Sequence, residues 1–192
     1  MVIRYLHISW KEYHTLARKL AASILDQSGQ FDEIVAISRG GLTLGHLLTD
    51  FLRIPIATIT IQSYSDIQTR GAVQLTAKLS TPIKGKRVLL VDDVADSGKT
   101  MKRAMGYLRR LGPANITTVT MFYKSRSVFR PDFFGSITNK WILFPYEPIE
   151  MILLITKQME QEGKTKAQIQ TFLEKLGVTD AEIAFARKHH LR

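Results

Sequence analysis

The chain has 192 residues, a net charge of +10 and no cysteine. This length suffices to bury a sizeable core, and the lack of cysteine excludes disulfide frameworks, thiolate metal sites and cysteine nucleophiles. Its apolar runs fall far short of a membrane span and its first residues lack a signal-peptide layout, so we expect a cytoplasmic protein with no membrane partner. The positive charge favours polyanionic partners, of which small phosphorylated substrates and nucleic acids are both open.

The first part of the chain alternates helical and strand patterns. Ser9 and Glu12 form a capping-box pattern ahead of apolar residues at helical spacing, which predicts a helix over about 10–27. The short apolar run 31–38 predicts a strand that leads into a glycine-rich turn. Residues 42–52 return to helical spacing, so a second helix follows that turn.

In the next part, strand patterns frame a long irregular stretch. The run 56–61 predicts a strand, and 63–85 predicts a long loop with room for a short hairpin. Residues 86–92 hold four consecutive apolar residues, the pattern of a buried parallel strand. A helix to about residue 111 and a strand over 116–123 follow.

The last part of the chain has a different character. Prolines and glycines interrupt residues 125–148, which predicts irregular structure. Three helical patterns follow over 150–162, 165–176 and 179–190, and the third opens on a second capping box. These residues therefore predict a separate helical segment.

Strands that alternate with helices predict an α/β fold with a doubly wound, mostly parallel sheet. Ligands of such sheets bind beyond the carboxyl ends of the strands. The segments 38–41 and 92–100 follow two of the predicted strands and are rich in glycine and polar residues. We therefore expect the functional site at these two segments.

The segment 92–100 ends in Gly98-Lys99-Thr100, as the P-loop of nucleotide hydrolases does, but it suits another ligand. A P-loop needs glycine where Asp93 stands, and a carboxylate there would repel phosphates, so we exclude nucleoside triphosphate hydrolysis. The N–H groups that open the next helix can instead hold one phosphate. The acids before them can hold hydroxyl groups or hydrated Mg²⁺, which implies a phosphorylated polyol substrate.

This segment resembles the phosphoribosyl-diphosphate motif of type I phosphoribosyltransferases: apolar residues, two acids, then Asp-Ser/Thr-Gly-x-Thr. The resemblance implies that the ribose and its 5′-phosphate bind to Asp92, Asp93, Ala95, Asp96, Ser97, Gly98, Lys99 and Thr100. It also implies that Asp92 and Asp93 hold Mg²⁺ as cofactor, and that Asp96 is the catalytic acid or base near N7 of a purine.

Other segments resemble the 6-oxopurine branch of that family, especially the bacterial xanthine-guanine enzymes. The resemblance assigns the diphosphate to Ser38, Arg39, Gly40 and Gly41. In the family, the peptide bond before that arginine is often cis. Ser63 and Tyr64, followed by Arg70, resemble the family's mobile catalytic loop. The resemblance implies that Ser63 and Tyr64 form a lid that would exclude water from a reactive sugar cation, and that Arg70 is a catalytic residue.

Three further residues imply a purine pocket. In the resemblance, Lys124 donates to the 6-oxo group, the Trp141 ring stacks on the base and the Ile142 main chain meets the purine edge. An ammonium group has only donors, so it favours a carbonyl over an amino group. Departures from the family pattern W-I-x-x-P-W-D occur at Leu143, Tyr146 and Glu147. They leave guanine, xanthine and hypoxanthine all open.

The resemblance covers roughly residues 5–148. It implies a Mg²⁺-dependent enzyme of purine salvage that joins phosphoribosyl diphosphate and a 6-oxopurine at N9 and releases diphosphate. We expect a phosphoribosyltransferase domain over 1–149, with a small hood formed by about 125–148 and N-terminal residues. A C-terminal helical extension over 150–192 would pack on this body or build a homo-oligomer, a dimer or a tetramer.

Two alternatives stay open. A regulator with this fold could bind nucleic acid through the pairs Lys102-Arg103 and Arg109-Arg110, although we interpret these as a solvated face and expect no nucleic-acid partner. A transferase for another base would need an acceptor in place of Lys124 for adenine, or several cationic donors for orotate. The intact predicted base pocket favours the 6-oxopurine enzyme.

Overall fold

The computed structural model describes residues 4–64 and 72–191. The chain divides into two compact units. The sheet unit comprises His14–Asn139, and the terminal unit combines Met1–Tyr13 with Lys140–Arg192. Within the described residues, no helix is both long enough and apolar enough to span a membrane.

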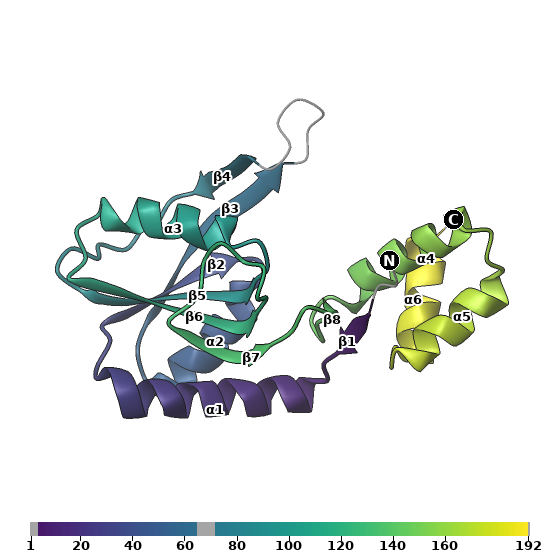
Figure 1. Cartoon of the computed structure of the whole chain (residues 1–192), viewed down its shortest axis with the longest axis horizontal. Coiled ribbons are helices and arrows are strands. Elements are labelled where there is room, and N and C mark those ends of the chain that lie inside the picture. Colours follow the sequence, from purple (N-terminus) through teal and green to yellow (C-terminus); the bar gives the residue numbers. More distant parts are fainter. Residues whose placement is uncertain (1–3, 65–71, 192) are drawn as a thin grey trace. The chain divides into compact units, whose positions relative to one another are not determined.

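In the part of the chain that the structure describes, the sheet unit holds a six-stranded sheet in the order β4-β3-β2-β5-β6-β7. The strands are β2 (Glu33–Ser38), β3 (Ile56–Tyr64), β4 (Ala72–Ala77), β5 (Arg87–Ala95), β6 (Asn115–Tyr123) and β7 (Phe133–Ile137). Neighbours run parallel except β3 and β4, which form an antiparallel hairpin. In Figure 1, α3 (Lys99–Arg109) lies on one face of the sheet, with α2 (Gly41–Leu52) and most of α1 (Trp10–Ser28) on the other. The predicted doubly wound α/β sheet is therefore confirmed.

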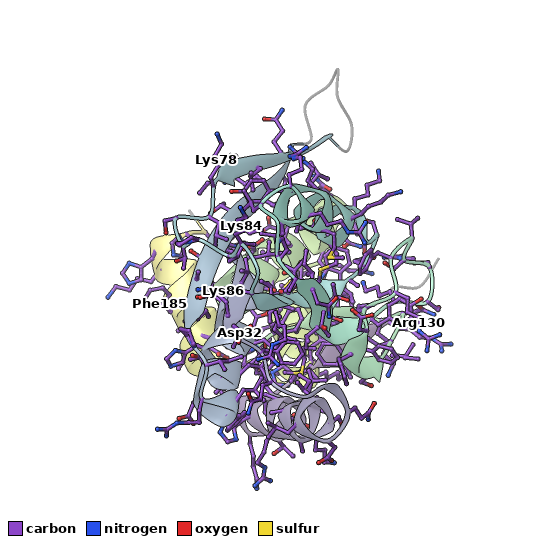
Figure 2. All side chains as sticks on the ribbon, turned by 90° about the vertical axis from the view of Figure 1, so that its left-hand side faces the viewer. Asp32, Lys78, Lys84, Lys86, Arg130 and Phe185 are labelled. Atoms are coloured by element: carbon purple, nitrogen blue, oxygen red, sulfur yellow. The ribbon has the colours of Figure 1, made fainter. Side chains whose placement is uncertain are left out.

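Ion pairs hold the amino ends of β2 and β5 together. Lys86 donates to the almost fully buried Glu33 at 2.8 Å. Arg87 donates to Asp32 through its guanidinium and its backbone N–H, and these hydrogen bonds lower the pKa of Asp32 to about 2. Asp32 and Lys86 are labelled on the near side of the sheet unit in Figure 2. Both carboxylates at this end therefore have a cationic partner.

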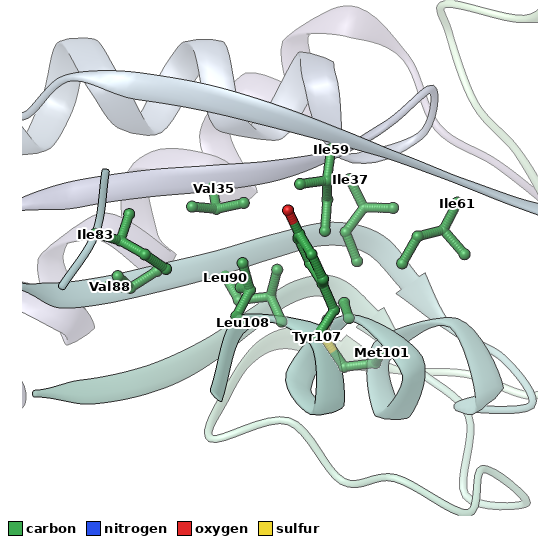
Figure 3. Close-up of a cluster of buried hydrophobic side chains, with 11 residues drawn as sticks. Val35, Ile37, Ile59, Ile61, Ile83, Val88, Leu90, Met101, Tyr107 and Leu108 are labelled. Atoms are coloured by element: carbon green, nitrogen blue, oxygen red, sulfur yellow. The ribbon is translucent and has the colours of Figure 1, made fainter. Parts of the chain in front are cut away.

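The core explains why β5 is a central strand. Its four consecutive apolar residues are all fully buried, and such a strand is stable only when helices cover both of its faces. Figure 3 shows the side covered by α3, where Met101 and Leu108 pack with Leu90. The ring of Tyr107 joins this cluster, and its hydroxyl accepts a hydrogen bond from the Leu79 backbone N–H at 3.0 Å. Met101 is thus a buried core residue.

The element boundaries differ from the sequence-based expectation in several places. β3 continues to Tyr64 rather than ending at residue 61, and β4 pairs with it within the stretch that the sequence predicts to be a long loop with room for a hairpin. β5 continues to Ala95 rather than ending at Asp92, so Asp93 lies within the strand. Residues 125–148 are not irregular throughout, because β7 and a further short strand occupy part of them. β7 pairs at the edge of the sheet and is only partly buried, so it carries no apolar run that a pattern search could find.

In the terminal unit, β1 (Tyr5–His7) pairs in parallel with β8 (Trp141–Leu143). Strands of three residues have too few positions to show a period, so the sequence pattern misses both. The three predicted C-terminal helices are confirmed as α4 (Pro148–Gln161), α5 (Lys166–Lys175) and α6 (Asp180–His189). Aliphatic residues of all three helices form one core, and the predicted capping box between Thr179 and Glu182 opens α6.

Candidate functional site

The two predicted loops follow β2 and β5, which are neighbours in the sheet. A Cβ atom on Gly40 would overlap the Asp93 carboxylate. One on Gly41 would lie 2.5 Å from the carbonyl oxygen of Val91. Only glycine therefore lets the loops approach this closely, and the structure brings the predicted diphosphate loop and the acid pair together.

The peptide bond between Ser38 and Arg39 is cis, as the resemblance implies. The Ser38 hydroxyl donates to the Ile59 carbonyl oxygen at 3.1 Å and lies 2.7 Å from the Thr60 hydroxyl oxygen. These contacts fix the end of β2 against β3. Arg39 follows with an exposed side chain, which is accessible to an anion in solution.

Asp92 and Asp93 form a pair of like charges near the end of β5. Asp92 is only 8% exposed, and the Asp93 backbone N–H donates to its carboxylate at 3.1 Å. Burial, and then the neighbouring charge of Asp93, raises the pKa of Asp92 well above its usual range. Hydroxyl donors or a cation would offset this cost, so the pair is arranged to receive one of them.

The acid pair fits one kind of Mg²⁺ site. Among the described residues, no cluster of three or more His, Asp or Glu side chains could hold a metal ion by itself. Proteins often bind Mg²⁺ through one or two carboxylates, while substrate phosphates and water complete its shell. Asp92 and Asp93 therefore fit an ion that arrives together with a phosphorylated substrate.

Gly98 makes the turn from β5 into α3. Its φ of +78° lies in the left-handed region. A Cβ atom there would lie 2.5 Å from Ser127 Oγ and 2.6 Å from the Phe129 backbone nitrogen. Conformation and space therefore both require glycine. α3 begins at the next residue, Lys99, and the N–H groups of a first helical turn can bind a phosphate, as the sequence predicts.

Two cationic side chains hold Asp96. Lys124 Nζ donates to its Oδ2 at 2.8 Å, and the Arg126 guanidinium donates to its Oδ1 from Nε at 3.0 Å and from Nη2 at 2.6 Å. The Lys124 side chain is 6% exposed, whereas that of Asp96 is 44% exposed. Partial burial raises the pKa of Asp96, but the hydrogen bonds from Lys124 and Arg126 outweigh it, so the net shift is downward. The predicted catalytic group is therefore an ionised carboxylate with both oxygens engaged.

Arg126 is a site residue that the sequence analysis misses. It follows Lys124 by two positions in a loop, where an arginine is usually a solvated surface charge. No motif marks it. The available signal is the run Lys124-Ser125-Arg126 after a strand, because a buried lysine beside a second cation needs an anion nearby.

The two predicted purine-contacting residues of β8 belong to the terminal unit. Trp141 is 47% exposed, and its Nε1 donates to the sulfur of Met151 at 3.4 Å. Ile142 is buried beside it in the strand. The role of Trp141 and Ile142 in one purine pocket with Lys124 stays a prediction.

The structure also gives the positions of four other predicted residues. Ala95 is the buried last residue of β5, and Thr100 stands in the first turn of α3. Ser63 and Tyr64 are the last two residues of β3. Arg70 lies outside the described residues, so the predicted lid stays a prediction.

Comparison with known proteins gives a consistent result. The sequence matches the family described as "Phosphoribosyl transferase domain" over residues 9–148, which include both site loops. The xanthine-guanine phosphoribosyltransferase of Idiomarina loihiensis is 32% identical over 148 residues, which cover 75% of this chain and 88% of that protein.

Solved structures have the same fold. The purine phosphoribosyltransferase from Pyrococcus horikoshii matches with a TM-score of 0.68 and 28% identity, covering 76% of this chain and 95% of its own. The Helicobacter pylori xanthine-guanine-hypoxanthine phosphoribosyltransferase has a TM-score of 0.69 and 23% identity, covering 78% of this chain and 97% of its own. This second match concerns the fold alone.

Proposed function

Because the chain belongs to the phosphoribosyl transferase domain family, we propose that it transfers the phosphoribosyl group of phosphoribosyl diphosphate to N9 of a 6-oxopurine, in purine salvage. The names of its relatives support this choice, since one acts on xanthine and guanine and another on a purine. The main observation in support of the proposal is that the 38–41 loop packs directly against Asp92 and Asp93, a few residues before α3 begins.

The site meets three demands of the sugar substrate. Arg39 and the backbone N–H groups of Gly40 and Gly41 would bind the leaving diphosphate and stabilise its charge. Asp92 and Asp93 would accept hydrogen bonds from the ribose hydroxyl groups, and the start of α3 would hold the 5′-phosphate. Mg²⁺ held by the two acids would supply further charge neutralisation for the diphosphate. A substrate fixed at all three points can break its C1–O bond in place.

Asp96 and Lys124 would act on the purine. The Lys124 ammonium would donate to the 6-oxo group and weaken its present hydrogen bond to Asp96. Because that hydrogen bond lowers the pKa of Asp96, its loss would make the carboxylate a better acceptor for the purine N7 proton. Arg126 would keep Asp96 oriented through Oδ1. Asp96 would thus become an effective proton acceptor only when the purine is bound.

Five residues complete the proposed site on the strength of the resemblance. Trp141 would stack on the purine, and the Ile142 main chain would meet its edge. Ser63 and Tyr64, with Arg70, would form a lid that excludes water from the sugar cation.

A panel of bases tests the proposal. Guanine, xanthine, hypoxanthine, adenine, uracil and orotate are each incubated with phosphoribosyl diphosphate and Mg²⁺, and diphosphate release is measured. We expect turnover with the first three only, because the Lys124 ammonium can donate to their 6-oxo group. Turnover that is fastest with adenine, or absent with all six bases, would contradict the assignment. Omission of Mg²⁺ in a parallel series tests the cofactor.

We also propose that the protein is a cytoplasmic homo-oligomer, a dimer or a tetramer, assembled through residues 150–192. Leu154 on α4 and Phe185 on α6 support this, because each is a large apolar side chain that is about half exposed. Light scattering of the whole chain and of the variant Leu154→Lys, Phe185→Lys would test it. A monomeric wild-type protein would contradict the proposal.

A further inference from the structure

One side of α3 carries positive charge that the proposed reaction does not use. It forms a groove, here called the α3 groove, that is lined by Val73, Lys99, Lys102, Arg103, Gly106 and Arg110. Val73 comes from β4, so the groove runs between α3 and the edge strand of the sheet. α3 itself contains no acidic residue. Among the described residues, none of the four cations has an ion-pair partner.

The cations of the α3 groove follow the helical period. Lys99, Arg103, Gly106 and Arg110 are separated by four, three and four residues, which places them in one line along the helix. Lys102 lies beside this line, three residues after Lys99. From Lys99 to Arg110 the line is about 16 Å long at the rise of an α-helix. One line of cations matches one strand of phosphates, whereas a duplex presents two.

Gly106, at the middle of the line, has no packing reason to be glycine. A Cβ atom built there would meet no atom of residues 4–64 and 72–191 within 4 Å, and glycine is less stable than alanine inside a helix. A bare backbone at the centre of a basic groove does allow an anionic chain to approach closely. None of the six lining residues is aromatic, so the groove offers phosphate contacts but no platform for stacking bases.

We propose that the α3 groove binds a single-stranded polynucleotide through its phosphates, without reading its sequence. This revises the expectation that the basic pairs of this helix form only a solvated face. RNA and single-stranded DNA carry the same phosphates, so a test must compare them. Lys99 also belongs to the predicted 5′-phosphate site, and the other lining residues do not.

Fluorescence anisotropy with a labelled mixed-sequence RNA of about twelve nucleotides, at about 50 mM salt, tests the proposal. We expect saturable binding with a log–log salt slope of about −2 to −3, because about 0.7 counterions are released per phosphate that a cation neutralises. Single-stranded DNA of the same sequence should bind within about threefold, because it carries the same phosphates. Duplex DNA should bind no more tightly, because only one of its two strands can follow the line of cations. A tighter complex with duplex DNA, or no saturable binding of either single strand, would overturn the proposal.

A matched pair of charge reversals localises the site. The groove variant carries Lys102→Glu, Arg103→Glu and Arg110→Glu. The control variant carries Arg18→Glu, Lys19→Glu and Lys84→Glu at exposed positions outside the groove, so its net charge is the same. The groove variant should bind at least about tenfold more weakly, and the control less than about threefold. Equal losses would overturn the proposal.

The variant Gly106→Leu tests whether the shape of the α3 groove contributes to binding independently of its charge. It leaves net charge unchanged and fills the centre of the line, so it should weaken RNA binding about fivefold or more. Purine turnover should stay at the wild-type level, since Gly106 lies outside the proposed transferase site, and circular dichroism checks the fold. The binding result does not depend on whether the purine assignment is right. Undiminished RNA binding by Gly106→Leu would overturn the proposed groove.

Discussion

The amino ends and the carboxyl ends of β2 and β5 differ in whether their carboxylates are stabilised by neighbouring charges. At the amino end, Glu33 and Asp32 each have a cationic partner, and hydrogen bonds from Arg87 lower the pKa of Asp32 to about 2. At the carboxyl end, burial and the charge of Asp93 raise the pKa of Asp92. The amino end is therefore stabilised by its charges, while the carboxyl end keeps Asp92 buried beside the like charge of Asp93, an unfavourable arrangement of the kind that functional sites often hold.

The largest effect should come from removing the acid pair. In the double variant Asp92→Asn, Asp93→Asn, kcat/KM with guanine should fall by about 10³-fold, because the sugar hydroxyls and Mg²⁺ lose their anionic partners. The variant should be at least as stable as the wild type at neutral pH, since a buried like-charge contact is gone. Steady-state kinetics and urea unfolding measure the two effects. Normal turnover, or a large loss of stability, would contradict the view that Asp92 and Asp93 serve the substrate rather than the fold.

The raised pKa of Asp92 also predicts how stability depends on pH. The unfolded chain releases this proton near the usual value of 3.8, but the folded protein retains it to higher pH. The stability contributed by this group is therefore present below 3.8 and lost as pH rises through the folded-state pKa. Relative to Asp92→Asn, the wild type should lose unfolding free energy from about pH 4 upward. A difference that stays flat across a urea-unfolding series would contradict this.

At the amino end, Lys86→Met should destabilise the fold without affecting turnover. It leaves the buried Glu33 carboxylate without its partner, which costs about 3–5 kcal/mol for a deeply buried pair. Because the Lys86 side chain is 35% exposed, solvent reduces this to about 2 kcal/mol. Arg87→Met is the matched control and should have a smaller effect, since its partner Asp32 is exposed. Reduced kcat in folded Lys86→Met would show that this end is not purely structural.

A smaller effect should follow from Arg126→Gln, which removes two hydrogen bonds from Asp96. We expect kcat to fall about tenfold. Since the hydrogen bonds from Arg126 lower the pKa of Asp96, the acid limb of the pH–rate profile should move to higher pH. Arg126→Lys should restore part of the activity. Arg130→Gln is the control, because that guanidinium lies over the Phe134 ring and should leave the profile unchanged.

The smallest effect should come from Gly106→Ala on α3, away from both strand ends. A methyl group there would contact no atom in the described part of the chain, so only helix propensity changes, and the unfolding free energy should rise by about 0.5–1 kcal/mol. Thermal unfolding followed by circular dichroism measures this. A lower melting temperature would mean that the glycine serves the fold rather than a ligand.

The sequence predicts the local backbone arrangement at the carboxyl ends of β2 and β5, because the determinants of that arrangement are local. Residues 92–100 are contiguous, and Gly98 is required by its own backbone conformation as well as by its neighbours. The cis bond before Arg39 follows from the resemblance of a four-residue loop. Four apolar residues in β5 likewise need no distant information to predict a buried strand.

The features that escaped prediction depend on distant or very short segments. The Arg126 side chain reaches Asp96 from thirty positions away, and no periodic pattern encodes that contact. β1 and β8 have three residues each, and in the described part of the chain each is a strand because it pairs with the other. β7 is an edge strand without an apolar run, so its pairing with β6 decides its conformation.

The pairing of Tyr5–His7 with Trp141–Leu143 has a consequence for biosynthesis. On the ribosome, Tyr5–His7 is synthesised before His14–Asn139 and stays unpaired while that stretch is translated. That intervening stretch is continuous, so it can collapse cotranslationally, whereas the unit made from both chain ends closes only after its second strand leaves the exit tunnel. A nascent polypeptide stalled before residue 141 would therefore leave the backbone N–H and C=O groups of Tyr5–His7 without their pairing partner, and such unpaired groups are open to pairing with other chains.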